Sequence, residues 1–190
     1  MSSHLINKMK KTFFNKFYKN YKNSFFKSFN NLDINNFNKL AEILKNLKKN
    51  KVILFGNGGS ASIVSHVALD LVNVCNIKSI HFNEASIITC YANDYGYEHS
   101  VTQSLKKFLE IGDVVILISS SGESRNMINA ARFIKKNKNL LITFTGFNKN
   151  NRLKSIGDIN FWVNNKTYNI VENIHQSWLL MLVDYIKFIK

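Results

Sequence analysis

The stretch KVILFGNGGSASIVSHVALD, residues 51–70, holds the local signals that decide the fold. It begins with an apolar run at 52–55, turns through Gly56, Gly58 and Gly59, and continues with apolar residues at helical spacing. A short apolar run bounded by glycine predicts a buried strand, and the periodic segment after the turn predicts a helix over 60–74. A strand, a glycine turn and a helix in this order are typical of parallel α/β sheets, whose ligands bind beyond the carboxyl ends of the strands.

The same alternation continues to the end of the chain. We therefore predict an α/β fold, a three-layer sandwich with a mostly parallel, doubly wound sheet. The 190 residues, without proline, suit a single domain over 1–190, with its α/β core at 51–190. Further strands are predicted at 79–82, 114–118, 141–144 and 160–163, and further helices at 97–110, 125–136 and 169–189.

Two helices are predicted before the sheet, in residues 1–50. Aromatic residues recur every three or four positions over 12–29, and a second apolar period over 34–47 follows Asp33, a suitable N-cap. So many aromatic side chains on one helix need a partner surface. We expect the pair to form part of an oligomer interface, and a helix lying on a membrane surface is the alternative.

The charge is strongly positive but says little about partners. The net charge is +14, and residues 1–50 carry 11 lysines against two acids. Only three arginines are present, so the side chains that read base edges are scarce and no nucleic-acid partner is expected. The sequence also shows no long apolar run and no signal-peptide pattern, which predicts a cytoplasmic protein without a membrane partner.

Two loops that each open a helix resemble anion sites. The glycine turn offers backbone N–H groups, and its G-x-G-x-x-A pattern with Glu84 would also suit a dinucleotide-binding oxidoreductase. The second loop, SSSGES at 119–124, crowds four hydroxyls at one helix N-terminus. These are more donors than a helix cap uses, and phosphate has several oxygens to satisfy, so we predict phosphate binding by Ser119, Ser120, Ser121 and Ser124.

Four stretches in combination resemble a known family: GNGGSASIVSHVALD at 56–70, ANDYGYEHS at 92–100, GDVVILISSSGESRN at 112–126 and ENIH at 172–175. The chain is similar over nearly its whole length to the sugar isomerase (SIS) domain family, and most closely to phosphoheptose isomerases. The resemblance implies a phosphorylated sugar substrate and a homotetramer whose pockets are completed by neighbouring subunits. The implied reaction converts sedoheptulose 7-phosphate to D-glycero-D-manno-heptose 7-phosphate through an enediolate.

The resemblance also carries residue roles to matching positions. The four serines at 119–124 match the phosphate-binding loop, and Asn93 and Asp94 match a substrate-binding loop. The implied sugar-contacting residues also include Asn57, Gly58, Gly59, Ser60 and Glu172.

The family's acid–base and zinc positions are altered in this chain. The base appears as Asp70, four residues after His66, in place of the usual glutamate. Glu172 stands where some relatives have a glutamine ligand to zinc, and Leu180 stands where they have a histidine. The resemblance therefore implies at most a zinc site of His66, Asp70 and Glu172, a donor set that also suits harder divalent ions.

His175 is the candidate replacement for the lost imidazole, because it lies on an adjoining part of the helix face that carries Glu172. The predicted catalytic set is thus Asp70, Glu172 and His175. The departures leave two interpretations, a rearranged isomerase or a SIS module that binds sugar phosphates for sensing or regulation. We favour the isomerase, because a binding module has no physical need for Asp70 beside His66.

Overall fold

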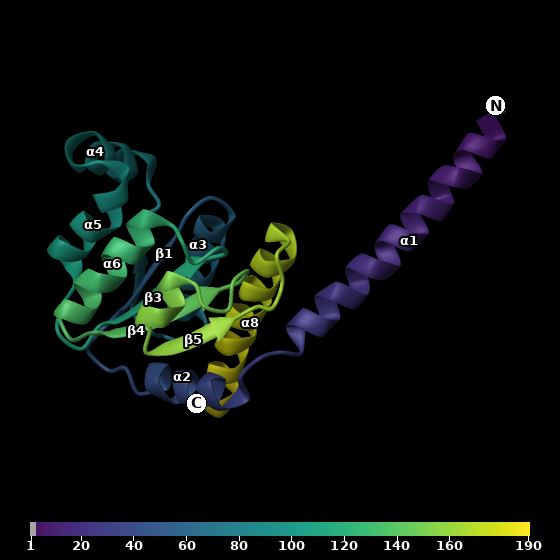
Figure 1. Ribbon diagram of the computed structural model, residues 1–190. Coiled ribbons are helices and arrows are strands. Elements are labelled where there is room, and N and C mark those ends of the chain that lie inside the picture. Colours follow the sequence, from purple (N-terminus) through teal and green to yellow (C-terminus); the bar gives the residue numbers. More distant parts are fainter. Residues whose placement is uncertain (1–2) are drawn as a thin grey trace.

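The protein is a five-stranded parallel sheet between two layers of helices (Figure 1). The computed structural model describes the backbone of residues 3–190 and the side chains of residues 12–190. The strand order is β2-β1-β3-β4-β5, and every pair of neighbours is parallel. The strands are β1 Val52–Gly56, β2 Ser79–His81, β3 Val114–Ser119, β4 Leu140–Thr145 and β5 Ile159–Trp162.

Both faces of the sheet are buried because successive residues of a strand point to opposite sides. Leu54 and its register partner Ile116 join one core, whereas Ile53 and its partner Val115 join the other. The first core is covered by α2 (Ile34–Lys45), α3 (Gly59–Asn73) and α8 (Tyr168–Ile189), and the second by α5 (Ser100–Phe108), α6 (Arg125–Lys136) and α7 (Arg152–Ile156). The predicted three-layer α/β sandwich is confirmed.

The topology brings the two predicted anion loops together. β1 and β3 are neighbours in the sheet, yet the chain runs from β1 toward β2 on one side and from β3 toward β4 on the other. Gly56 at the end of β1 pairs with Ile118 near the end of β3. The loops that follow these strands therefore leave the same edge side by side, at the switch point where ligands bind in such sheets.

The segment between β2 and β3 differs from the prediction. A helix that the sequence analysis missed, α4 (Ala85–Tyr95), precedes a 3₁₀ turn, η1 (Tyr97–His99), and the predicted helix over 97–110 is α5, shortened to 100–108. Gly96, with φ of 82°, separates α4 from η1. No residue of α4 is buried, so its apolar spacing lacks the strong one-sided pattern of a core helix.

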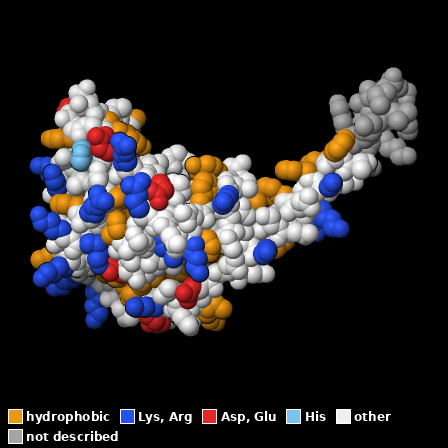
Figure 2. Space-filling view, in the orientation of Figure 1, with side chains coloured by type: hydrophobic (Ala, Val, Ile, Leu, Met, Phe, Trp, Pro, Cys, Tyr) orange, Lys and Arg blue, Asp and Glu red, His pale blue; other side chains and the backbone are white. Residues whose placement is uncertain are grey.

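The N-terminal helices behave differently from each other. The Asp33 carboxylate caps α2 as predicted, because its Oδ1 accepts a hydrogen bond from the backbone N–H of Asn36 at 3.0 Å. Helix α1 (Ser3–Phe29) extends away from the domain as an arm (Figure 1), and Figure 2 shows hydrophobic side chains along it. Phe13, Phe14 and Phe17 are exposed, whereas Tyr21, Phe25 and Phe29 pack against the core. In the described part of the chain, no helix combines the length and apolarity that crossing a membrane requires.

Candidate active site

The serine loop, residues 119–124, joins β3 to α6 at the carboxyl edge of the sheet. Ser119 Oγ lies 3.2 Å from Ser124 Oγ, and Ser121 Oγ accepts a backbone hydrogen bond within the loop at 3.2 Å. The Oγ of Ser120 is buried and has no hydrogen-bond partner among the described residues. Because a buried hydroxyl without a partner costs free energy, its place beside a cavity favours a ligand that satisfies it.

This cavity, which we call the serine cavity, has a volume of about 100 Å³. It contains all four serines that the sequence analysis assigned to phosphate, so the structure brings that predicted set together. The other polar residues that line it are Asn57, Ser60, Tyr168 and Glu172.

Buried contacts hold the serine loop from behind. Asn151 is fully buried, and Gly122, with φ of +67°, packs so closely on it that any Cβ at position 122 would collide with its side chain. The carbonyl of Gly122 accepts a hydrogen bond from Leu153 N at 3.0 Å, and the carbonyl of Ser120 accepts one from Gly146 N at 2.9 Å. The loop is therefore preorganised, with its four serines at the wall of the cavity.

The glycine turn, residues 56–59, places the N-terminus of α3 against Glu172 of α8. A Cβ on Gly59 would collide with the Glu172 carboxylate, so only glycine allows this approach. The carboxylate therefore lies at the N-terminus of α3, the positive end of the helix dipole. Glu172 thereby lies next to the serine cavity without a basic side-chain partner among the described ion pairs.

Glu172 also lines a second, larger hollow between α3 and α8. This histidine cavity has a volume of about 430 Å³ and contains His66 and Gln176. His66 Nε2 lies 3.3 Å from Asp70 Oδ2, and Gln176 Nε2 lies 3.5 Å from His66 Nδ1. The Glu172 carboxylate therefore lies between the serine hydroxyls of one cavity and the His66–Asp70 pair at the other.

The structure does not place His175 at the candidate site. The side chain is fully buried, its Nε2 lies 3.0 Å from the carbonyl of Thr145, and its ring packs edge-on against Phe144. Burial lowers the pKa of His175 to about 4, against the opposing effect of the Thr145 hydrogen bond, so the ring is neutral. It faces neither cavity, because one residue along a helix turns the side chain by about 100° from the direction of Gln176.

Asn93 and Asp94 also lie apart from the serine loop. The predicted substrate loop is in fact the last turn of α4, where Asn93 Nδ2 donates to Asp94 Oδ1 at 3.0 Å and both side chains are exposed. Neither residue lines the serine or the histidine cavity. A single chain therefore does not bring this pair to the site, and their contact with substrate stays a prediction.

The residues predicted to hold zinc do not form a zinc site. No cluster of three or more His, Cys, Asp or Glu side chains suited to a metal occurs among residues 12–190. His66 and Asp70 pair with each other, Glu172 lies against Gly59, and Leu180 offers no donor atom. The donor set thus falls short of the four ligands of a structural zinc site or the three protein ligands of a catalytic one.

Sequence reasoning missed the residues that hold Asn57. Tyr97 and Asn126 both hydrogen bond to the Asn57 amide, although they lie 40 and 69 positions further along the chain. Asn126 gave one usable signal, since a polar residue in the first turn of α6 follows directly on the serine loop. Tyr97 gave none, because its approach depends on η1.

Comparisons with known proteins agree with this architecture. A family model described as SIS domain matches residues 17–146. The phosphoheptose isomerase of Thermodesulfovibrio yellowstonii is 37% identical over 145 residues, which cover 72% of this chain and 72% of that protein. The phosphoheptose isomerase of Fusobacterium nucleatum is 31% identical over 153 residues, 77% of this chain and 78% of that protein.

Among solved structures, the phosphoheptose isomerase of Neisseria gonorrhoeae has a TM-score of 0.83 at 21% sequence identity, covering 90% of this chain and 98% of that one. The likeness in structure supports the fold, and the sequence relatives support the activity. The chain therefore belongs to the SIS domain family and, within it, to the phosphoheptose isomerases, and it is an isomerase.

Proposed function

We propose that this isomerase interconverts sedoheptulose 7-phosphate, a ketose, and D-glycero-D-manno-heptose 7-phosphate, an aldose. The observation that carries the proposal is the position of Glu172, which lines both the serine cavity and the histidine cavity. A substrate whose phosphate binds the serine loop extends its sugar past this carboxylate toward His66. The anion site and a base therefore lie within reach of one elongated molecule.

The serine loop supplies the phosphate contacts in this proposal. Hydroxyl groups and backbone N–H groups donate to the phosphate oxygens, and the unpartnered Ser120 hydroxyl gains the acceptor that it lacks. Binding energy at the phosphate then holds the reacting carbons near Glu172, which turns a bimolecular proton transfer into an effectively unimolecular one.

Glu172 moves the proton between the two carbons. It removes a proton from C1 of the ketose, the C–H electrons form the C1–C2 double bond, and the former carbonyl oxygen O2 takes the negative charge. While the enediolate is bound, the proton on Glu172 exchanges with solvent, and Glu172 then delivers a proton to C2 and is ionised again at the end. His66 donates a proton to O2 and removes the proton from O1, so that C1 becomes the aldehyde carbon and no proton is gained or lost.

Asp70 orients His66 in this scheme. Its Oδ2 lies 3.3 Å from His66 Nε2, so it can accept a hydrogen bond from that nitrogen and hold the ring in one orientation. No step is routed through zinc, because the donors of this chain do not fit it. Metal analysis of protein purified without a histidine tag tests this arrangement, and one tightly held metal ion per subunit would contradict it.

The assembly that we propose is a homotetramer, as the family resemblance implies. Two features support association: the exposed aromatic residues of α1, and the exposed side chains Leu69 and Val72 on α3, beside Asp70. Neighbouring subunits would cover these surfaces and complete the pockets. Light scattering at micromolar concentration checks the assembly, and a monomer would contradict it. The cytoplasmic location remains a prediction from the sequence.

The activity is tested by proton NMR of sedoheptulose 7-phosphate with the purified protein. We expect aldose signals to grow at the expense of the ketose. Binding without conversion, seen as thermal protection by the sugar phosphate with no aldose signal, would contradict the isomerase and favour the sensing module instead.

A further inference from the structure

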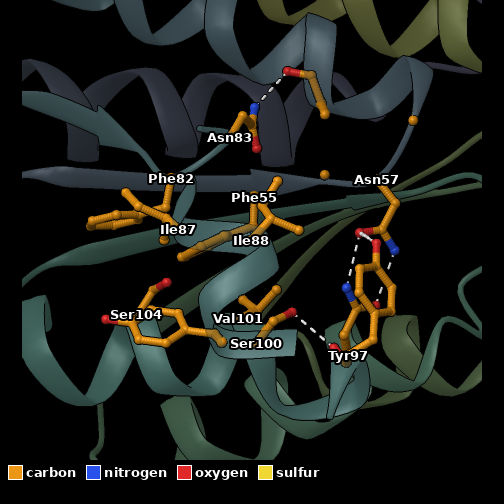
Figure 3. A pocket seen from close by; sticks show the side chains of 15 residues that line it. Phe55, Asn57, Phe82, Asn83, Ile87, Ile88, Tyr97, Ser100, Val101 and Ser104 are labelled. Carbon is orange, nitrogen blue, oxygen red and sulfur yellow. Dashed lines mark hydrogen bonds between the residues drawn. The ribbon is translucent and has the colours of Figure 1, made fainter. Parts of the chain in front are cut away.

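The Asn57 side chain is held on several sides before any ligand binds (Figure 3). Its Nδ2 donates to Asn126 Oδ1 at 3.0 Å, and its Oδ1 accepts from Asn126 Nδ2 at 2.9 Å and from the Tyr97 hydroxyl at 3.0 Å. Asn57 lies between two hollows, the serine cavity and an aromatic pocket of about 80 Å³ that is walled in part by Tyr97 and Asn126.

These contacts fix which way the Asn57 amide points. The backbone N–H of Met127 donates to Asn126 Oδ1 at 3.0 Å, and since an N–H can only donate, the atom that faces it must be oxygen. The Asn126 NH₂ group therefore faces Asn57. Because this group can only donate, the Asn57 atom beside it must be oxygen. The Tyr97 hydroxyl occupies the second lone pair of that oxygen, so Asn57 Oδ1 is saturated.

What remains free on Asn57 is a donor. One of its two Nδ2–H groups is used by Asn126, and the other has no partner among the described residues. Asn57 can therefore offer a hydrogen bond to a ligand but cannot accept one. A flipped amide would turn an oxygen toward the ligand and repel any oxygen that gains negative charge there.

We infer that Tyr97 and Asn126 are positioning residues that make Asn57 a fixed N–H donor to the sugar oxygen that becomes negative in the enediolate. This inference rests on the proposed function, because the charge on O2 arises only when a proton leaves C1. Preorganised donors aimed at such an oxygen lower the barrier without reorganising during the reaction.

The segment that carries Tyr97 is itself anchored. The carbonyl of Tyr97 accepts a hydrogen bond from Ser100 Oγ at 2.8 Å, and the carbonyl of Glu98 accepts one from Asn129 Nδ2 at 3.0 Å. Gly96, with φ of 82°, permits the sharp change of direction that brings η1 toward the glycine turn. The phenol is thus held by α5 and α6, both of which pack on the sheet.

The test replaces one hydroxyl at a time. Tyr97→Phe removes the bond to Asn57, and Tyr91→Phe is the matched control, because it removes a phenol hydroxyl from the same aromatic pocket with no hydrogen bond to Asn57. We expect Tyr97→Phe to lower kcat for the heptose phosphate about tenfold, the size of one positioning hydrogen bond. KM, and thermal protection by inorganic phosphate, should stay within about twofold, since the serine loop is untouched.

A double-mutant cycle separates positioning from general destabilisation. Asn57→Ala, followed at higher enzyme concentration, removes the donor itself, so Tyr97→Phe should cause no further loss in that background. An additional tenfold loss there, or equal rates for Tyr97→Phe and Tyr91→Phe, would overturn the inference while leaving the isomerase intact. An unmodified protein that converts no heptose phosphate would overturn the proposed function, and this inference with it.

Discussion

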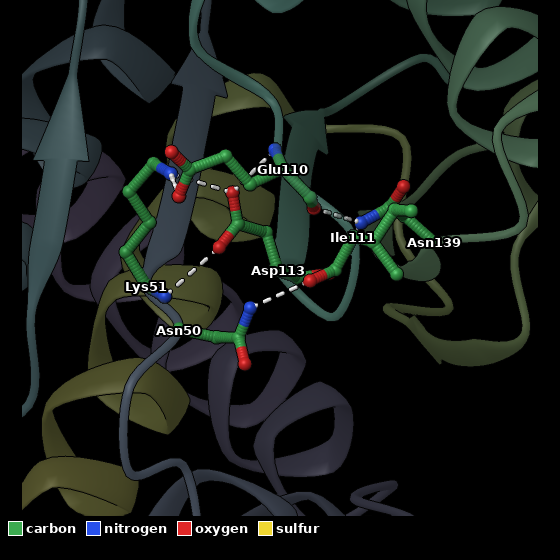
Figure 4. Close-up of polar contacts among 6 residues, drawn as sticks. All are labelled: Asn50, Lys51, Glu110, Ile111, Asp113 and Asn139. Atoms are coloured by element: carbon green, nitrogen blue, oxygen red, sulfur yellow. Dashed lines mark hydrogen bonds and ion pairs between the residues drawn. The ribbon is translucent and has the colours of Figure 1, made fainter.

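In the part of the chain that the structure describes, polar side chains are paired with one another at the amino edge of the sheet, and several lack partners at the carboxyl edge. At the amino edge, before β1 and β3, the carboxylate of fully buried Asp113 accepts hydrogen bonds from Lys51 N at 3.0 Å and from Glu110 N at 2.9 Å (Figure 4). The Lys51 ammonium lies 2.8 Å from Asp113 Oδ2 and 2.7 Å from Glu110 Oε2. Asn139 adds donors to two carbonyls of the same turn.

At the carboxyl edge the polar groups are left incomplete. Among the described residues, the Ser120 hydroxyl is buried without a partner, one N–H of Asn57 has none, and Glu172 forms no ion pair. The amino edge therefore serves stability, since its charges satisfy one another, whereas the carboxyl edge keeps its hydrogen-bonding capacity for a ligand. Substitutions at the carboxyl edge should therefore lower activity, and substitutions at the amino edge should lower stability.

Among substitutions that leave Glu172 itself in place, the largest effect on turnover is expected for Gly59→Ala. A Cβ at this position collides with the Glu172 carboxylate, so the base must move, and a misplaced base costs on the order of a hundredfold in rate. We expect turnover to fall by about that factor. Ala61→Ser, a small change two residues along α3, serves as the control, and equal turnover of the two variants would contradict the proposed place of Glu172.

Next is Asp113→Ala, which should destabilise the fold by about 3 kcal/mol. It leaves the backbone N–H groups of Lys51 and Glu110 without their acceptor, and the Lys51 ammonium keeps only the exposed Glu110 carboxylate. Turnover below the melting temperature should be retained. Urea unfolding measures the loss, and Glu110→Gln, at an exposed carboxylate of the same cluster, should cost less than about 1 kcal/mol. Loss of turnover in a folded Asp113→Ala protein would contradict the assignment of stability to the amino edge and activity to the carboxyl edge.

A smaller effect is expected for Ser120→Ala. Removing a buried hydroxyl that lacks a partner should leave the free energy of unfolding unchanged or slightly higher, yet weaken phosphate binding about tenfold. The melting temperature without phosphate reports the stability of the variant, and its rise on adding inorganic phosphate reports binding. The control is Ser79→Ala, which removes another buried, unpartnered hydroxyl, at the amino end of β2. If the two variants bind phosphate equally, Ser120 is not a ligand of the phosphate.

Two buried groups, His175 and Asp113, should lose their contributions to stability at different pH. The pKa of buried His175 is lowered to about 4, mainly by desolvation, and an unfolded histidine titrates near 6.5, so its contribution to stability is complete above about 6.5 and lost as the pH falls toward 4. Desolvation opposes ionisation of Asp113, but hydrogen bonds from Lys51 and Glu110 outweigh it and hold its pKa below 3.8.

The Asp113 contribution is therefore complete above 3.8 and lost only at lower pH. Urea midpoints measured from pH 7.5 to 3 should fall in two steps. His175→Gln should remove the first step and Asp113→Asn the second. A flat midpoint between pH 6.5 and 4 in the unmodified protein would show that His175 is not buried neutral.

Much of the fold could be predicted because its signals are local. The buried strands are short apolar runs, the glycine turn and the serine loop follow two of them, and parallel topology then requires those loops to meet. Helix α4 was missed because none of its residues is buried, and its apolar pattern therefore has no clear inner face.

The candidate site was predictable where it depends on one loop and not where it depends on packing. The four serines lie together because they are neighbours in sequence. His175 and Gln176 are adjacent in sequence, but the docking of α8 buries the first and turns the second toward His66. Only tertiary structure decides that rotation. The contacts of Asn57 with Tyr97 and Asn126 likewise need the assembled sheet.

In the proposed function, Glu172 at the carboxyl edge is the base of the isomerase. The most direct measurement is deuterium uptake at C1 of sedoheptulose 7-phosphate in deuterated water, followed by proton NMR for the unmodified protein and for Glu172→Gln. We expect uptake by the unmodified protein and a loss of about a thousandfold in Glu172→Gln, with thermal protection by inorganic phosphate retained. Uptake at equal rates by both proteins would contradict this role of Glu172.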